Sequence, residues 1–115
     1  MDPADTVRTY YAAIDGGDYD RLDDLLVPDF VQHRPDRTFV GREAFVNFMR
    51  DERPRTETEH AVDALYRRTS GEGGEGVGVV ARGRVLADDG AELFAFADAF
   101  EVVDGRLRSL HTYTA

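Results

Sequence analysis

Cysteine is absent from the 115 residues of this chain. Its absence excludes disulfide bonds, thiolate metal ligands and a cysteine nucleophile. Long apolar runs are also missing, so the sequence predicts no membrane-spanning segment. The N-terminal stretch MDPADTVRTYY has neither the basic region nor the apolar region of a secretory signal. We therefore expect a cytoplasmic protein that does not act at a membrane.

Lysine is the second absence. All 14 basic residues are arginines, and 23 acidic residues give a formal net charge of −9. The acids are spread along the chain, and this charge is expected to repel nucleic acid and anionic membranes. A dispersed acidic surface without lysine is typical of cytoplasmic proteins of salt-loving microbes, where salt screens the self-repulsion. The alternative is a GC-rich genome that encodes arginine in place of lysine.

The first half of the chain carries the signals of three helices. The first is predicted from Pro3 to the glycine pair at 16–17, because proline suits the first helical position and apolar residues follow at helical spacing. Its apolar face is expected to hold Val7, Tyr10, Tyr11 and Ile14. The second helix is predicted from Asp18 to Pro28, and the third from Gly41 to Pro54. A short strand, 30–33, is expected between them.

In the second half of the chain, the sequence pattern predicts strands at 56–68, 77–86, 93–103 and 106–113. The stretch GEGGEG at 71–76 lacks the lysine of a phosphate loop and is interpreted as a turn. Asp104-Gly105 is a two-residue hairpin signal. In the first strand, alternation places His60, Val62, Ala64 and Tyr66 on one face. The order indicates a single α+β domain spanning 1–115, in which helices pack on one face of a curved, mostly antiparallel sheet around a conical cavity.

The strand LFAFADAFEVV, residues 93–103, contains an unexpected charge. Period two places Phe94, Phe96 and Phe100 on one face, together with Asp98. An ionised carboxylate there is costly unless it is paired, hydrogen-bonded or kept neutral by a raised pKa. Asp98 is therefore expected to point into the cavity. The opposite face, made of Leu93, Ala95, Ala97 and Ala99, is small and apolar and predicts a homodimer through the back of the sheet.

Three motifs resemble the NTF2-like superfamily, which includes ketosteroid isomerases and SnoaL-like polyketide cyclases. They are TYYAAIDGGDYDRLDDLLVPDFVQH at 9–33, VGREAF at 40–45 and FADAF at 96–100. The resemblance covers the whole chain and implies a cone-shaped fold of three N-terminal helices on a strongly curved sheet. These motifs indicate the fold far better than the function, because the fold hosts many chemistries.

The resemblance to ketosteroid isomerases implies roles for three residues. Tyr10 matches the tyrosine of the oxyanion hole, Asp98 matches the proton-donating aspartic acid, and His33 stands where the isomerase has its aspartate base. In these roles His33 would move a proton beside a carbonyl, while Asp98 and Tyr10 would hold the enolate oxygen. A histidine at the base position departs from the isomerase pattern, so the steroid reaction itself is in doubt.

The remaining candidates for ligand contact are residues expected to line the cavity. They are Tyr11, Phe30, Phe45, Phe48, Met49, His60, Phe94, Phe96, Leu110 and Thr112. His111 is expected to share the dimer-facing side of the last strand with Leu107, Ser109 and Tyr113. No histidine spacing of the HExxH kind is present, so neither a metal nor a cofactor is expected.

Two functional hypotheses follow. The first is an isomerase, cyclase or dehydratase that acts on a small, largely apolar carbonyl compound. The second is a module that binds a small ligand or dimerises without turnover, in which Asp98 and His33 form a structural pair. A cavity lined by Tyr10, His33 and Asp98 together would favour the first hypothesis.

Overall fold

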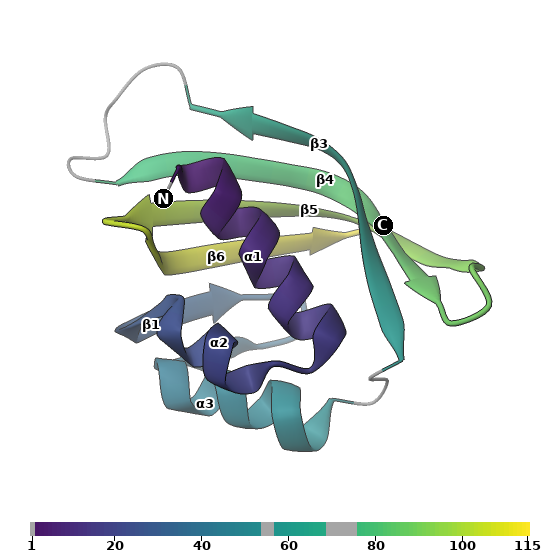
Figure 1. Cartoon of the computed structure of the whole chain (residues 1–115), viewed down its shortest axis with the longest axis horizontal. Coiled ribbons are helices and arrows are strands. Elements are labelled where there is room, and N and C mark those ends of the chain that lie inside the picture. The colour runs from purple at the N-terminus through teal and green to yellow at the C-terminus, as the bar shows by residue number, and fades with distance from the viewer. Residues whose placement is uncertain (1, 54–56, 69–75) are drawn as a thin grey trace.

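The six strands form one sheet, with the helices on one of its faces (Figure 1). The computed structural model describes residues 2–53, 57–68 and 76–115. The elements are, in chain order, α1 (Pro3–Gly16), α2 (Tyr19–Asp24), β1 (Leu26–His33), β2 (Thr38–Val40), α3 (Arg42–Asn47), the π-helical turn η1 (Phe48–Glu52), β3 (Thr58–Arg67), β4 (Val77–Ala87), β5 (Glu92–Val103) and β6 (Arg106–Thr114). The strand order is β2-β1-β6-β5-β4-β3. This architecture confirms the predicted α+β fold.

Helix α1 has the predicted bounds. Pro3 occupies its first turn, and Gly17 ends it in the left-handed conformation at φ 68°, which glycine adopts without strain. Helix α2 begins after Asp18, whose side chain accepts a hydrogen bond from the Arg21 N–H. It ends at Asp24, earlier than predicted, because the chain passes directly into β1. Pro28 therefore lies within a strand, in a stretch of β1 that makes no register pairs with β6.

Strand β2 was not expected from the sequence. It forms a hairpin with β1, in which Val31 pairs with Val40 and His33 with Thr38. Three residues are too few to show a period of two, so the pattern gave no signal. The predicted turn at 71–76 lies outside the described residues apart from Gly76, and so does Pro54, the predicted end of the third helix.

Strands β3 to β6 form the predicted antiparallel meander, and β6 also pairs in parallel with β1. Strand β3 bends strongly, and its first part lies beside the C-terminal end of α1 (Figure 1). Gly83 of β4 lies at this bend: a Cβ there would overlap the carbonyl oxygen of Ala61 and approach Phe96 Cζ to 3.0 Å. Glycine at this position allows β3 and β4 to approach closely.

Irregular pairing changes which side chains face inward. Asp63 is an extra residue in β3, because Val62 pairs with Gly83 while Ala64 pairs with Arg82. The bulge reverses the alternation, so Tyr66 is 52% exposed and the prediction that it shares a face with His60 is wrong.

Two further irregularities lie in β5 and β6. Val102 pairs with Leu107 while Glu101 pairs with Ser109, so Leu107 turns into the core at 0% exposure and not toward the outer face as predicted. In β5 the pairing shifts at Leu93, because Val85 pairs with Phe94 while Leu86 pairs with Glu92. Leu93 therefore lines the cavity, and the prediction that it shares the outer face with the alanines is wrong. Period-two counting cannot anticipate such shifts, because one extra residue exchanges the two faces.

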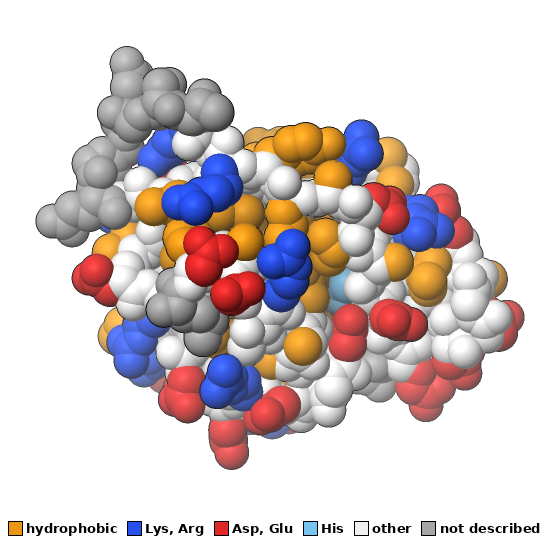
Figure 2. Space-filling model, turned by 45° about the horizontal axis from the view of Figure 1, so that its top comes forward, with side chains coloured by type: hydrophobic (Ala, Val, Ile, Leu, Met, Phe, Trp, Pro, Cys, Tyr) orange, Lys and Arg blue, Asp and Glu red, His pale blue; other side chains and the backbone are white. Residues whose placement is uncertain are grey.

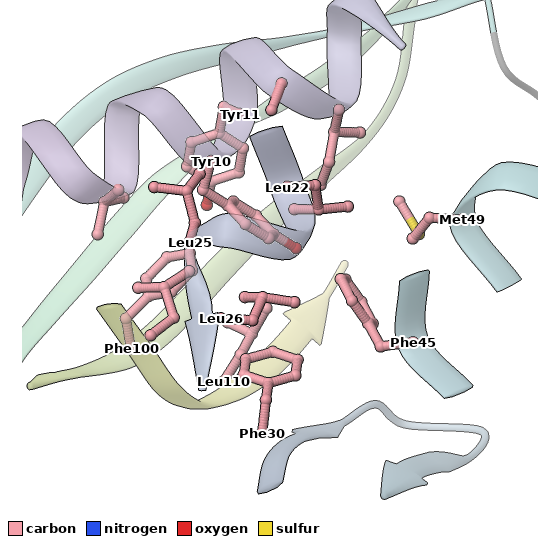
Figure 3. Close-up of a cluster of buried hydrophobic side chains, with 14 of the residues drawn as sticks. Tyr10, Tyr11, Leu22, Leu25, Leu26, Phe30, Phe45, Met49, Phe100 and Leu110 are labelled. Carbon is pink, nitrogen blue, oxygen red and sulfur yellow. The ribbon is translucent and has the colours of Figure 1, made fainter. Parts of the chain in front are cut away.

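The hydrophobic core fills the space between the helices and the concave face of the sheet (Figure 3). Tyr10 and Tyr11 of α1 both contact Phe100 of β5, with ring centroids 5.3 and 5.9 Å apart. Phe45 of α3 packs on Phe30 of β1 at 5.1 Å. These contacts join the helices to the sheet and fix the positions of Tyr10 and Tyr11.

On the face shown in Figure 2, acidic and arginine side chains are interspersed, with apolar side chains between them. Across the outer side of the sheet, Tyr66 pairs with Val80 and Val80 with Ala99. Tyr66 and Val80 are 52% and 39% exposed. The homodimer through this face stays a prediction. None of the helices in the described part of the chain is long and apolar enough to cross a membrane.

Candidate functional site

A partly open cavity of about 300 Å³ lies between the helices and the sheet. That volume is at the lower end of the range of small-molecule sites. Much of its wall is apolar, and this part consists of Ile14, Phe48, Met49, Val85, Leu93, Phe94 and Phe96. The polar part of the wall includes Tyr10, Gln32, Arg34, Arg53, His60, Asp98 and Thr112. An apolar cavity with a few polar groups suits a small, largely apolar ligand that carries oxygen atoms.

Asp98 is buried at 5% exposure, on the Phe96 and Phe100 side of β5 as predicted. The Tyr11 hydroxyl donates a hydrogen bond to Oδ2 at 2.6 Å. Oδ1 has no hydrogen-bond partner among the described residues. Burial raises the pKa of Asp98 above its ordinary value, although the Tyr11 hydrogen bond, the nearby Thr112 hydroxyl and the charges of His60 and Arg34 act the other way.

The raised pKa explains how a carboxyl group can lie among the aromatic side chains of LFAFADAFEVV. A protonated Asp98 removes the cost of burying a carboxylate among aromatic rings. Because Oδ2 accepts from Tyr11, the acidic proton belongs on Oδ1. Burial therefore favours the protonated form of Asp98, a form that can donate a hydrogen bond into the cavity.

The two tyrosines of α1 do not have the roles that were predicted for them. Tyr10 lines the cavity, whereas its neighbour Tyr11 holds Asp98 and does not line the cavity itself. Both are buried, with ring centroids 5.2 Å apart at 74°. Burial first and the nearby Asp98 second raise the pKa of both phenols, so both stay neutral donors. The motif match pointed to Tyr10, but the donor to Asp98 is Tyr11.

His60 forms a second polar pair with Asp15 of α1. Nδ1 lies 2.6 Å from Asp15 Oδ1, and the His60 backbone N–H donates to Oδ2 at 2.9 Å. A carboxylate accepts hydrogen bonds, so this contact places the imidazole proton on Nδ1 and leaves Nε2 free. The His60 ring lies 5.1 Å from that of Tyr11 and 5.6 Å from that of Phe96. The imidazole thus stands in the cavity wall beside the Asp98–Tyr11 pair.

Asp15 was missed at the sequence level, although a signal existed. It follows Tyr11 by one helical turn, and residues four apart lie on the same helix face. An acid that continues the apolar face of a helix is a candidate for a buried pair. His60 lies at the boundary between the cavity and a second hollow, which Arg8, Asp15 and Val62 also line.

His33 lies outside the cavity. Strand β1 pairs with β6 so that His33 stands beside His111, and their rings stack at 4.3 Å. Both histidines are exposed. The expectation that His33 shares a pocket with Asp98 is therefore wrong. Counting by two from the buried Phe30 places Gln32 inward and His33 outward, and Gln32 is the residue that lines the cavity.

The other predicted contact residues fall into two groups. The cavity wall includes Phe48, Met49, His60, Phe94, Phe96 and Thr112. Phe30, Phe45 and Leu110 lie in the hydrophobic core at 0% exposure, because packing against other core side chains covers them. The cavity also takes in two residues that the sequence gave no reason to select, Arg34 and Arg53. The described part of the chain contains no group of three or more side chains suited to hold a metal ion.

The chain belongs to the family of SnoaL-like domains, whose model matches residues 7–110. Solved structures of similar fold include an NTF2-like protein of unknown function from Cytophaga hutchinsonii (19% identity, TM-score 0.75, 97% of this chain and 88% of that one). A candidate ketosteroid isomerase from Kribbella flavida is 20% identical, with a TM-score of 0.72 over 96% of this chain and 75% of that one.

The orange carotenoid protein of Anabaena with canthaxanthin bound is also similar in fold. It is 21% identical and has a TM-score of 0.78, covering 93% of this chain and 35% of that one. No curated protein matches. These similarities confirm the NTF2-like fold that the sequence motifs predicted.

Proposed function

We propose that this chain binds a small, largely apolar carbonyl compound and catalyses proton transfer at the carbon next to the carbonyl. The observation that supports this most is the pairing of a neutral acid with an oriented imidazole in one cavity wall. Asp98, held by Tyr11, is the acid, and His60, held by Asp15, is the base. Isomerisation, cyclisation and dehydration can all use such a pair.

Each residue has a defined part in this reaction. Removing a proton beside a carbonyl moves negative charge onto the carbonyl oxygen. A hydrogen bond from Asp98 Oδ1 to that oxygen stabilises the charge, and it is strongest where water is excluded. As Asp98 gives up part of its proton, the Tyr11 hydroxyl stabilises the developing carboxylate.

The base in this proposal is His60, in place of the His33 suggested by the isomerase resemblance. Nε2 is the ring nitrogen left to accept the substrate proton. Asp15 fixes the orientation of the ring and stabilises the imidazolium that forms. The SnoaL-like family and the fold shared with a candidate ketosteroid isomerase are consistent with this chemistry.

Ligand binding without turnover is the second candidate. The orange carotenoid protein shares the fold and holds canthaxanthin, and the cavity wall here is largely apolar. In that case Asp98 would fix the orientation of a ligand oxygen, and the His60–Asp15 pair would only join α1 to β3.

Deuterium exchange separates the two candidates. Propiophenone, 1-tetralone and 2-cyclohexenone are incubated with the protein in D₂O, and loss of the α-proton signal is followed by NMR. We expect the wild-type protein to exchange at least one ketone faster than buffer, and His60→Gln and Asp98→Asn to reduce the rate by about 100-fold or more. His33→Gln is the matched control and should keep the full rate, because His33 lies on the outer face. Binding of the ketones without faster exchange would favour the second candidate.

A further inference from the structure

Two arginines from separate segments reach the same cavity. Arg34 follows β1 and Arg53 follows η1, and both line the cavity with Asp98. The Arg34 guanidinium lies over the Phe48 ring at 5.7 Å and has the exposed Asp36 at 3.8 Å. Arg53 Nη2 donates to the Tyr19 hydroxyl at 3.3 Å.

The guanidinium groups of Arg34 and Arg53 have few acidic hydrogen-bond acceptors near them. Arg53 Nε is buried and has no acceptor within the described ranges. Elsewhere in the chain, arginines make close pairs, such as Arg68 with Glu101 at 2.8 Å. An arginine donor withdrawn from water without an acceptor is costly, so a ligand oxygen is the natural partner in the cavity.

The positive charge also acts on the interior of the cavity. Both guanidinium groups lower the pKa of Tyr10, against the larger effect of burial, and Arg34 does the same for Asp98. The acid that shares this wall, Asp98, is neutral in the proposed function. Although the chain carries −9 overall, this cavity therefore favours an anion. Planar guanidinium groups bind carboxylates through paired hydrogen bonds.

We propose that the ligand is an apolar oxo acid whose carboxylate binds to Arg34 and Arg53 while its ketone oxygen accepts from Asp98. The role of the ketone rests on the proposed function. The carboxylate contact does not, since it requires binding only. The apolar wall around Phe94 and Phe96 takes the hydrocarbon part of the molecule.

Titration calorimetry with 4-oxo-4-phenylbutanoate and its methyl ester tests this inference. The two compounds share the ketone and the aromatic ring and differ in the charge. We expect the acid to bind about tenfold or more tightly than the ester. Arg34→Gln and Arg53→Gln should each weaken acid binding by about tenfold and leave ester binding unchanged. Arg53→Lys, which keeps the charge but not the planar donors, should recover part of the loss.

Arg106→Gln is the matched control, because it removes the same charge from an exposed position in the β5–β6 hairpin. Equal affinity for acid and ester, no binding of either, or an equal loss in Arg106→Gln overturns the inference. The comparison of acid and ester uses the wild-type protein, so it tests the inference even if a variant does not fold. Arginine-dependent binding of the acid without faster α-proton exchange would refute the enzyme proposal and leave the anion site standing.

Discussion

Replacing Asp98 with Asn changes the pH dependence of stability in a defined direction. Asparagine has nearly the same shape and its Oδ1 can still accept from Tyr11, so the packing of β5 is kept. Burial raises the pKa of Asp98 above the usual 3.8. Between pH 3.8 and the raised value, the folded wild-type protein holds a proton that the unfolded chain has lost. Its free energy of unfolding therefore falls as the pH rises through this window.

The magnitude follows from one proton. A difference of one bound proton changes the free energy of unfolding by about 1.4 kcal/mol per pH unit. The Asn variant lacks this proton. Its free energy of unfolding, relative to that of the wild type, should therefore rise with pH by up to about 1.4 kcal/mol per pH unit. The rise should level off above the pKa that Asp98 has in the folded state. Below about pH 3, where Asp98 is protonated in both the folded and the unfolded state, the two proteins should differ by a constant amount.

Urea unfolding from pH 3.5 to pH 8 measures this difference, and subtracting the two curves cancels the other carboxylates. Asp88→Asn in the exposed β4–β5 turn is the matched control, because it removes a carboxylate that is not buried. A parallel curve for Asp98→Asn would mean that Asp98 ionises in the folded protein at its ordinary pKa. A relative gain by the wild type as the pH rises would mean that Asp98 is a stabilised carboxylate. Either result would remove the neutral donor from the proposed mechanism.

Two further substitutions test the structure around the cavity. Tyr11→Phe removes the hydrogen-bond donor to Asp98 Oδ2. It should lower the free energy of unfolding, measured with urea at neutral pH, by about 1–3 kcal/mol, because a buried acceptor loses its partner. A loss below about 0.5 kcal/mol would contradict the hydrogen bond. Gly83→Ala forces a methyl group against the Ala61 carbonyl and should lower stability by about 1–3 kcal/mol. A neutral result there would show that the bend between β3 and β4 does not need glycine.

Local signals were enough to predict most of the elements. Pro3 and the glycine pair at 16–17 bound α1, because proline fixes φ near the helical value and Gly17 adopts the left-handed φ that ends the helix. Asp104 and Gly105 both have positive φ, at 51° and 77°, as the hairpin signal requires. The alternation in β5 correctly placed Asp98 with Phe96 and Phe100 inside. These features depend on residues close together in the sequence.

The candidate site depends on residues far apart. Asp15 and His60 meet because the start of β3 lies beside the C-terminal end of α1, and no local pattern encodes that placement. Arg34 and Arg53 reach one cavity from separate segments, which the sequence shows only as two of 14 arginines. His33 was a different kind of error. The period of two places it outside, and only the resemblance to the isomerase motif placed it in the cavity.

By itself, the sequence determined the order of the elements, the shared face of Asp98 and its phenylalanines, and the family, because these follow from local geometry and from motifs. Only the tertiary structure decided which tyrosine holds Asp98, which histidine stands in the cavity wall, and which side chains the bulges turn outward. Those outcomes depend on strand register, where one extra residue exchanges the two faces of a strand. The aspartate was visible as an anomaly in the sequence, but its partner, Tyr11, was fixed by packing 87 residues away.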